Sequence, residues 1–357
     1  MGSRRCSAGN RAWPPPRARP YIWSIRAVPV GRPFMKLSVI LPCYNGAATL
    51  AVQMEALAAQ AWPGGWELIV VDNGSTDGSA AIAEAFRDRV PDLRIVQAHA
   101  PGTPRLGVPH SYNTGIAAAT GDAFVFCEAD DEVAAGWLQA MGEALARHDF
   151  VAARLDHRKL NPEWLHPVHG EGYQSEHLSR LPGYPYLAHA SGCAIGLRRA
   201  VWERVGAFEV ALPCVHDTDY CWRAQLQGFA LHLEKAALVH YREKQSLPAR
   251  LRQGRNWGRD YVRLLQRYGA PTRSLPRLRR LVWVLRCLSA GVPVGLRAGL
   301  GLADGRRRLA DWVWNFGWAW GEVLGTLGPP EPVRSELLAL ALARSTEGAQ
   351  AARPSTS

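Results

Sequence analysis

The stretch GDAFVFCEADDE, residues 121–132, joins a short apolar segment to four carboxylates within its last five residues. Its AFVF segment has the composition of a buried strand. Carboxylates that lie a few ångströms apart raise one another's pKa, so such a cluster usually persists where a cation lies among its members. The stretch therefore predicts a buried strand that runs into a cation site. The alternative is a solvated helix N-terminus, where the helix dipole favours acidic side chains.

Two earlier segments have the same form of an apolar strand that ends in a loop. KLSVILPCYNG (residues 36–46) closes on Pro, Asn and Gly, and WELIVVDNGSTDGS (residues 66–79) runs from a buried strand into a turn that begins at Asp72. Apolar residues with helical spacing follow each of them, at residues 47–62 and 79–89. This alternation predicts an α/β fold with a mostly parallel, Rossmann-like sheet, helices on both faces, and binding residues at the carboxyl ends of the strands.

The last third of the chain is predicted to be helical and basic. Between Arg242 and Arg308, 17 Lys and Arg face three acids, in a chain of 357 residues with a net charge of +11. Residues 248–330 predict amphipathic helices with Arg on one side and Trp and Leu on the other, which is typical of helices that lie on anionic membranes. The alternative is that the Trp side packs on the preceding domain and the Arg side is solvated. No stretch is apolar enough to span a membrane.

Both ends of the chain are predicted to be disordered. Residues 1–34 are rich in Arg and Pro and lack the apolar segment of a signal peptide, and residues 331–357 predict a short helix and a small, polar tail. The seven cysteines form no CxxC pair and their number is odd, which favours a reducing compartment. We therefore expect a cytoplasmic protein, either free or peripheral on the inner face of the membrane.

In their order along the chain, these motifs resemble the family 2 glycosyltransferases, which have the nucleotide-diphospho-sugar transferase (GT-A) fold. The resemblance covers residues 37 to about 269 and depends on SVILPCYNG, ELIVVDNGSTDGS, PRLGVPHSYNTGIAAATGD, FCEADDE, GCAIGLRRAVWERVGAFE, HDTDYCWRAQLQG and LVHYRE. It implies a GT-A domain at residues 35–247. The nucleotide-sugar-binding positions of the family fall on Pro42, Tyr44, Asp72, Arg105, Asn113 and Glu128.

The same resemblance implies a metal site, a general base and an acceptor side. FCEADDE stands where the family has its Asp-x-Asp metal motif, and Asp217 stands where the family has its base. The divalent cation, Mg²⁺ or Mn²⁺, would bind Glu128, Asp130 and His240. The acceptor-side positions fall on Gly192, Cys193 and His216.

Two residues depart from the family pattern. Glu128 replaces the first Asp of the metal motif, and His216 replaces the Glu that precedes the base. The first change keeps the charge and adds one methylene, and the second alters the side on which the acceptor binds. Because Asp130 and Asp217 remain in place, we expect an active enzyme.

The implied function is the inverting transfer of a sugar from a nucleotide-diphospho-sugar to a hydroxyl of a glycan or lipid-linked acceptor, in cell-envelope or other glycan biosynthesis. The alternative is a degenerate GT-A protein that binds a membrane or a glycan through its basic C-terminal helices. PCYNGAATL lacks both the Gly-rich phosphate loop of nucleotidyltransferases and the GxGxxG of dinucleotide oxidoreductases, which argues against both classes. No motif indicates nucleic-acid binding. The sequence predicts neither the donor sugar nor the oligomeric state.

Overall fold

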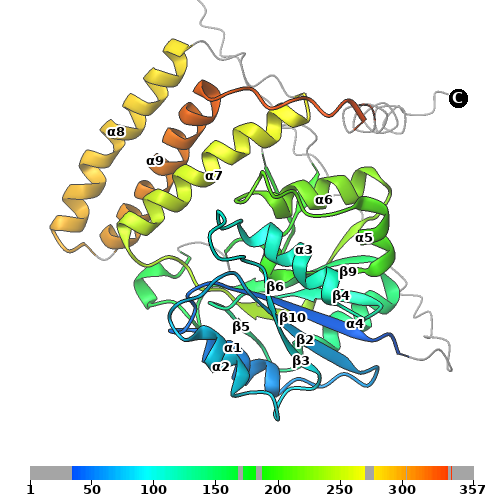
Figure 1. The fold of residues 1–357 in the computed structure, drawn as a ribbon. Helices are drawn as coiled ribbons and strands as arrows, with labels where there is room; N and C mark the ends of the chain where they lie inside the picture. Colours follow the sequence, from blue (N-terminus) through cyan, green and yellow to red (C-terminus); the bar gives the residue numbers. More distant parts are fainter. Residues whose placement is uncertain are drawn as a thin grey trace, which may run out of the picture. The chain divides into compact units, whose positions relative to one another are not determined.

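The computed structural model describes residues 34–167, 172–181, 187–269, 277–302, 304–336 and 339 (Figure 1). The predicted N-terminal extension, apart from Phe34, lies outside these residues, as does most of the predicted C-terminal tail. From Phe34 onward the chain forms one compact unit.

The described strands form one eight-stranded sheet with the order β3-β2-β1-β4-β9-β6-β10-β5, together with a separate antiparallel pair of short strands, β7 (Ser179–Arg180) and β8 (Ala188–His189). Strands β1, β2, β3 and β4 pair in parallel, as do β6 and β10, so the predicted, mostly parallel α/β sheet is confirmed. The strands of this sheet are β1 (Leu37–Cys43), β2 (Trp66–Asp72), β3 (Leu93–Gln97), β4 (Ala123–Phe126), β5 (Glu132–Val133), β6 (Phe150–Asp156), β9 (Ile195–Arg198) and β10 (Leu231–His240).

Strand β9 runs antiparallel to both of its neighbours, β4 and β6, and β5 runs antiparallel to β10 at the edge of the sheet. The parallel strands therefore lie in two groups, β3-β2-β1-β4 and β6-β10, on either side of β9. Ligands of such sheets bind beyond the carboxyl ends of the strands, where the strand order reverses. Here that place lies beyond β1 and β4.

Helices cover both faces of the sheet, because alternate residues of each buried strand point to opposite faces. In β1, Val39 and Leu41 pack in a core with α1 (Leu50–Ala58) and α4 (Trp137–Arg147). Ile40, between them, packs in the opposite core. The helices that contribute to that second core are α3 (Val108–Ala118), α5 (Arg199–Val205) and α6 (His216–Leu226).

One predicted helix is shorter than expected. The helix predicted at residues 79–89 is α2 (Ser79–Glu84), and residues 85–89 continue as turns. There the amides of Phe86 and Arg87 bond carbonyls three residues earlier, at Ala83 and Glu84, instead of four residues earlier as in an α-helix. The apolar spacing of this segment therefore extends beyond the helix itself.

The C-terminal segment forms three helices, α7 (Leu247–Arg267), α8 (Arg277–Gly299) and α9 (Gly305–Leu327), with α9 between the other two (Figure 1). Backbones of α7 and α9 approach each other closely at glycines, such as Gly258 against Trp318. A small third core joins Trp222 of α6 to Leu264 and Tyr268 near the end of α7. In the described part of the chain, no helix has the length and apolarity needed to cross a membrane.

Candidate active site

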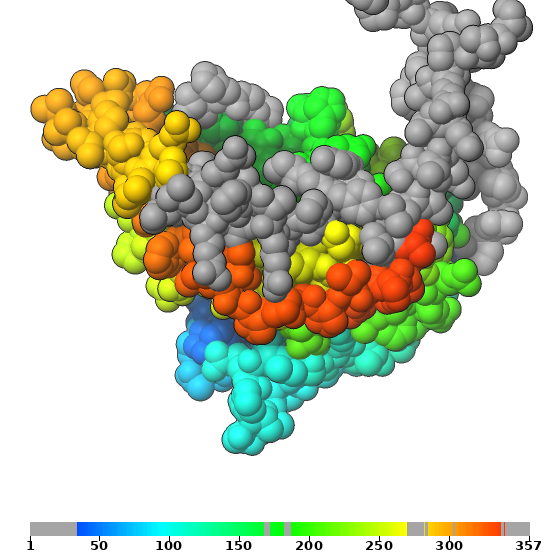
Figure 2. Space-filling view, turned by 90° about the horizontal axis from the view of Figure 1, so that it is seen from above, coloured from blue at the N-terminus to red at the C-terminus, as the bar shows by residue number. Residues whose placement is uncertain are grey.

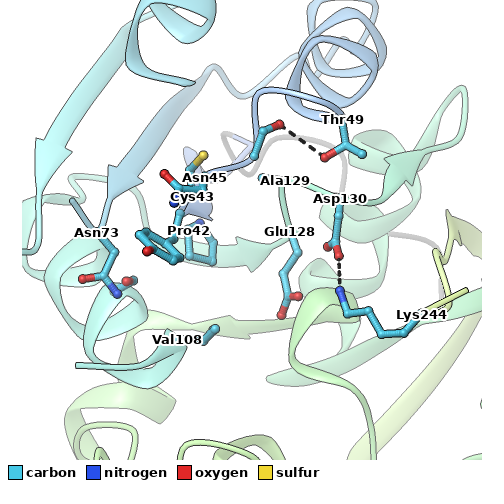
Figure 3. A pocket seen from close by; sticks show the side chains of 13 residues that line it. Pro42, Cys43, Asn45, Thr49, Asn73, Val108, Glu128, Ala129, Asp130 and Lys244 are labelled. Carbon is cyan, nitrogen blue, oxygen red and sulfur yellow. Dashed lines mark hydrogen bonds and ion pairs between the residues drawn. The ribbon is translucent and has the colours of Figure 1, made fainter. Parts of the chain in front are cut away.

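A cavity of about 340 Å³ opens beyond the carboxyl ends of β1 and β4 (Figure 3). Pro42 near the end of β1 and Tyr44 in the loop after it line the cavity, as do Glu128 and Asp130 in the loop after β4. In the close view Glu128 lies between Pro42 and Asp130, and Asp130 faces Lys244. The remaining residues that line the cavity are Cys43, Asn45, Gly46, Thr49, Asn73, Val108, Ser111 and Ala129. The predicted strand-end residues thus lie at one site.

Hydrogen bonds from the turn after β2 hold the loop after β1 in place. Asn45 has a left-handed backbone (φ 47°), and its side-chain oxygen accepts a hydrogen bond from the Thr76 amide at 2.9 Å. The Asp77 carboxylate accepts from the Ala47 amide at 2.9 Å and from the Ser79 hydroxyl at 2.5 Å. The motif VDNGSTDGS therefore forms a turn and also positions the residues that line the cavity.

Asp72 and Asn73 follow β2 and are each 5% exposed. Asp72 accepts hydrogen bonds from the Ser75 amide at 2.9 Å and the Gln97 side chain at 3.2 Å, and its contact with a base stays a prediction. Asn73 lines the cavity and donates to the Leu106 carbonyl, but its own side-chain oxygen has no partner in the described structure. A buried acceptor without a partner is costly, so Asn73 is a candidate ligand contact that sequence reasoning missed.

The four carboxylates of EADDE separate in the structure. Glu128 and Asp130 line the cavity, Asp131 is buried, and Glu132 belongs to β5 and pairs with Lys159 at 2.5 Å. The helix N-terminus that was the alternative for this stretch is therefore wrong, because a strand follows it.

Burial destabilises the charged forms of two acids at this site, Glu128 and Asp131. Burial, followed by the charge of Asp130, raises the pKa of Glu128 to about 7, and Glu128 accepts a hydrogen bond from the Tyr112 hydroxyl at 3.2 Å. Burial and the charges of Asp130 and Glu128 raise the pKa of Asp131 well above its usual range. Asp131 accepts from the Arg242 amide at 2.8 Å through one oxygen, and its other oxygen has no partner among the described residues. Oxygen-rich sites with this charge suit Mg²⁺ or Mn²⁺.

The three predicted metal ligands are not gathered into one coordination shell. Asp130 forms an ion pair with Lys244 at 2.8 Å, and His240 Nδ1 lies 2.7 Å from the carboxylate of Asp156. Among the described residues, no three His, Cys, Asp or Glu side chains are close enough to bind a metal ion together. Metal-binding histidines usually have a carboxylate or carbonyl on their other nitrogen, as His240 does here. The ligand set Glu128, Asp130 and His240 stays a prediction.

The hydrogen bonds that Asp156 accepts favour its charged form. Although partial burial opposes ionisation, the hydrogen bond with His240 and those from the amides of Arg158 and Lys159 hold the pKa of Asp156 below its usual range. Asp156 ends β6, the strand beside β10. It was not predicted, because nothing in the sequence pairs it with His240.

Asp217 lies in the first turn of α6 and points toward Gly192. Its carboxylate accepts hydrogen bonds from the Gly192 amide at 3.0 Å and from the Thr218 amide at 2.7 Å. The charge of Asp217 contributes to the raised pKa of Glu128, so the two carboxylates lie within electrostatic reach of each other. A carboxylate held in this way can accept a proton from a hydroxyl.

The acids of the motif HDTDYCWR do not cap α6. The residue before α6 is Val215, and no side chain caps the helix there. Arg223 is buried and forms an ion pair with buried Asp219 at 2.7 Å. The motif HDTDYCWR therefore supplies one acid to the site and one to the core.

Two of the three predicted acceptor-side residues lie beside Asp217. A Cβ on Gly192 would be 3.2 Å from His216 Nε2, a nitrogen without a partner in the described structure. His216 Nδ1 lies 3.0 Å from the Pro213 carbonyl, which fixes its ring. The prediction that Cys193 lies on the acceptor side is corrected. Its side chain is 1% exposed and packs in the core, so it does not face an acceptor.

Asn113 is a second correction. Its side chain donates to the Phe208 carbonyl at 2.9 Å and accepts from the Phe208 amide at 2.8 Å. Both ends of the amide are thus used to join α3 to the loop before α6, and the residue does not line the cavity. Arg105 stacks on Tyr44, with its guanidinium carbon 3.5 Å from the ring centroid, and its contact with a diphosphate stays a prediction.

Comparisons with known proteins agree with this geometry. The family model "Glycosyl transferase family 2" matches residues 38–206. The uncharacterized glycosyltransferase YibD of Escherichia coli (strain K12) is 29% identical over 264 residues, which cover 69% of this chain and 71% of that protein. The chain contains a family 2 glycosyltransferase domain at residues 38–206. It is therefore an enzyme, and the degenerate, non-catalytic alternative is not supported.

Two further proteins resemble this glycosyltransferase. The pre-mycofactocin glycosyltransferase of Mycobacterium tuberculosis (strain CDC 1551 / Oshkosh) is 28% identical over 78% of this chain and 58% of its own length. The solved structure of GalNAc-T7 with UDP, GalNAc and Mn²⁺ has a TM-score of 0.51 at 13% identity, over 66% of this chain and 48% of that chain. The second likeness concerns the fold alone and agrees with the GT-A prediction.

Proposed function

We propose that this glycosyltransferase moves a sugar from a nucleotide-diphospho-sugar to an acceptor hydroxyl, with inversion at the anomeric carbon and with Mg²⁺ or Mn²⁺ as cofactor. The observation that carries the proposal is the position of Asp217. Its carboxylate accepts a hydrogen bond from Gly192, which lies beside the Tyr112 hydroxyl that donates to Glu128. Glu128 lines the cavity together with Pro42, Tyr44 and Asp130. This combination provides for a base, a cation and an attacking hydroxyl at one place.

The donor would lie in the cavity beyond β1 and β4. Its volume of about 340 Å³ is within the range of small-molecule sites. Tyr44, 44% exposed, offers a ring face to a nucleobase, and Asn73 offers a buried oxygen to an N–H donor. Asp130, Glu128 and His240 would hold the divalent cation, which supplies positive charge to the leaving diphosphate. GalNAc-T7 was solved with UDP and Mn²⁺ on the same fold.

Asp217 would act as the general base. The amides of Gly192 and Thr218 hold its carboxylate, so its position is fixed before a substrate binds. Removing the proton from the acceptor hydroxyl as that oxygen attacks the anomeric carbon gives a single displacement, and a single displacement inverts the configuration. His216 and Gly192 would form the acceptor side. Because His216 stands where the family pattern has a Glu, the acceptor would contact an imidazole there instead of a carboxylate.

The function is tested by binding and turnover across UDP-, GDP- and dTDP-sugars, with and without Mn²⁺, in the wild type and in the Asp130→Asn and Asp217→Asn variants. We expect one nucleotide to bind in a metal-dependent manner. Asp130→Asn should lose the metal dependence, and Asp217→Asn should keep binding but lose transfer. NMR of the product gives the anomeric configuration. A folded wild type that binds none of the nucleotides would contradict the proposal, and retention of configuration would contradict the single displacement.

We also propose that the enzyme lies peripherally on an anionic, cytoplasmic membrane surface, where a lipid-linked acceptor would be within reach. Helix α8 packs on α9 through Gly291 under Trp312, and the Trp312 indole donates to the Cys287 carbonyl at 2.7 Å. Away from that contact, α8 presents apolar side chains that are 45–65% exposed; these are Leu285, Leu288, Val292 and Leu296. Figure 2 shows α8 in gold at the left of the view.

The charge beside this apolar stripe favours an anionic bilayer over a neutral one. Exposed Arg286 and Arg297 lie on the same side of α8, next to the stripe. Amphipathic helices of this kind bind anionic lipid both by burying apolar side chains and by the attraction of their positive charges to the headgroups. In the described part of the chain all six cysteines are unpaired, in keeping with the cytoplasm.

Flotation with phosphatidylcholine vesicles, with and without phosphatidylglycerol, tests this contact. We expect the wild type to float only with the anionic vesicles. A Val292→Asn, Leu296→Asn double variant should stay in solution while it keeps donor turnover. The control Val52→Asn, Leu106→Asn changes two exposed apolar residues elsewhere, 41% and 43% exposed, and should float like the wild type. No flotation of the wild type, or equal flotation of all variants, would contradict the proposal.

A further inference from the structure

Lys244 completes the cavity from a part of the chain beyond residue 206, where the family match ends. It follows β10, and its ammonium lies 2.8 Å from the Asp130 carboxylate (Figure 3). A lysine side chain is an ammonium ion at neutral pH, and the ion pair with Asp130 favours this charge. It is the only cationic side chain among the described residues that line the cavity.

The backbone before Lys244 is fixed on the acids of the site. The Arg242 amide donates to Asp131 at 2.8 Å, and the Arg242 side chain donates to the Asp130 carbonyl at the same distance. The Glu243 amide donates to the Asn161 side chain at 2.9 Å. The side chain of Lys244 itself is 47% exposed and makes its ion pair at the end of a flexible chain. Its backbone is therefore held in place, whereas its ammonium is able to change partners.

Glu243 connects this segment to the C-terminal helices. Its carboxylate is 14% exposed and lies 2.9 Å from Arg250 of α7, 3.8 Å from Arg307 of α9 and 3.5 Å from His157. Arg250, itself buried, also binds Asp311 of α9 at 3.2 Å. Although burial opposes ionisation, these neighbours lower the pKa of Glu243 to about 2. Helices α7 and α9 thus reach to within one residue of Lys244.

We propose that Lys244 binds the diphosphate of the donor, and that Glu243, with Arg250 and Asp311, positions it for this role. The inference rests on the proposed function. A divalent cation and an ammonium group repel each other when both lie on the Asp130 carboxylate. A divalent cation held by Asp130 would compete with Lys244 for that carboxylate, and the Lys244 ammonium would then be available to bind the diphosphate of the donor.

Lys244 would stabilise the charge that develops as the sugar leaves. The bond from the anomeric carbon to the phosphate oxygen breaks with its electron pair on the oxygen, and the ammonium donates a hydrogen bond to that diphosphate without transferring its proton. The new carbon–oxygen bond comes from the acceptor, whose proton goes to the base. Lys244 forms no covalent bond and is unchanged at the end.

Isothermal titration with the nucleoside diphosphate of the preferred donor, and with the corresponding nucleoside, tests the contact. We expect Lys244→Met to weaken binding of the diphosphate by about 10- to 100-fold, the range for a hydrogen bond to a charged group. Binding of the nucleoside should not change, and Lys244→Arg should restore much of the affinity. The control Lys235→Met removes an exposed lysine of β10 that pairs with Glu176, and this variant should bind the diphosphate like the wild type.

Two further measurements test the exchange of partners and the positioning role. Without nucleotide, Lys244→Met should bind Mn²⁺ more tightly than the wild type, because Asp130 has lost its competing cation. Glu243→Gln should weaken diphosphate binding less than Lys244→Met does, and the double variant should be no weaker than Lys244→Met alone. Arg308→Met is the control for the helices, because Arg308 lies on α9 but pairs only with Asp304 in the described structure. This variant should bind the diphosphate like the wild type.

The outcomes separate this inference from the proposed function. A wild type that binds no nucleotide overturns the proposed function and this inference with it. A wild type that binds the diphosphate, with a folded Lys244→Met variant of equal affinity, overturns the role of Lys244 alone. Equal losses for nucleoside and diphosphate in Lys244→Met also overturn it, because a general disturbance of the cavity would then explain the result.

Discussion

The contact between α7 and α9 should be weakened by a single added methyl group at Gly258. A Cβ at this position would lie 2.1 Å from the Trp318 carbonyl oxygen and 3.0 Å from the Trp318 Cα. A Cβ added to Gly254 would lie 2.3 Å from a facing carbonyl oxygen, and one added to Gly321 would lie 2.1 Å from another. All of these neighbours are backbone atoms, so no side chain can rotate away to make room.

The size of the effect follows from this overlap. Ordinary van der Waals contacts of a Cβ begin at 3.4 Å, so the helices must separate by roughly 1 Å. Overpacking costs about 1–3 kcal/mol where side chains can adjust, and more where backbones must move. Alanine returns about 1 kcal/mol through its higher helix propensity. We therefore expect Gly258→Ala to lower the free energy of unfolding by about 2 kcal/mol, or the Tm by about 4–8 °C.

Thermal and urea unfolding followed by circular dichroism measure this difference. The matched control is Gly295→Ala in α8, where an added Cβ would meet nothing within 4 Å. That variant should be as stable as the wild type or more stable by up to about 1 kcal/mol, because only the propensity changes. If the two alanine variants have the same stability, the close packing of α7 on α9 is refuted.

Asp217→Asn should lower kcat by about 10²- to 10⁴-fold and leave diphosphate affinity unchanged, in steady-state and titration measurements; an equal loss of affinity would argue against a general base. Asp219→Asn leaves Arg223 buried and unpaired and should cost about 3–5 kcal/mol in urea unfolding. Glu55→Gln, which breaks a pair with Arg89 at the surface, should cost much less stability than Asp219→Asn, and similar losses would contradict the difference in burial. The low folded-state pKa of Glu243, about 2 against an ordinary 4.5, means that its contribution is present above pH 4.5 and is lost as the pH falls toward 2. It amounts to roughly 3 kcal/mol, so the stability difference between wild type and Glu243→Gln should shrink steadily from pH 5 to pH 2.5, and a constant difference would refute it.

The parts of the site that lie at strand ends were predictable from the sequence, because their signals are local. An apolar segment followed by Asp72 or by EADDE identifies both the strand and the edge of the sheet at which it ends. Pro42, Tyr44, Glu128 and Asp130 accordingly line one cavity. The antiparallel orientation of β9 was not predicted, because the composition of a short buried strand is the same in either direction.

The hydrogen-bond partners of side chains were not predictable in the same way. Asn113 fits the family motif, yet its amide is used by the backbone of Phe208, 95 residues later. Lys244 reaches Asp130 across 114 residues, and it lies directly after the motif LVHYRE without being part of it. Asn73 gave a weak signal, since it directly follows Asp72 in VDNGSTDGS. A pattern specifies which residue types occur at a strand end, whereas long-range contacts decide which of them stay available to a ligand.

The spacing of the C-terminal helices and the position of Lys244 depend on the same contacts. Gly258 lies about two turns after Arg250 on α7, and Trp318 lies two turns after Asp311 on α9. The separation of backbones at Gly258 thus sets the distance at which Arg250 meets Asp311, which is 3.2 Å. Because Arg250 also holds Glu243, a change that parts the helices is transmitted to the residue beside Lys244. Gly258→Ala should therefore weaken diphosphate binding as well as stability, whereas Gly295→Ala should change neither adversely. If Gly258→Ala binds diphosphate as tightly as Gly295→Ala, this link between the helices and Lys244 is wrong.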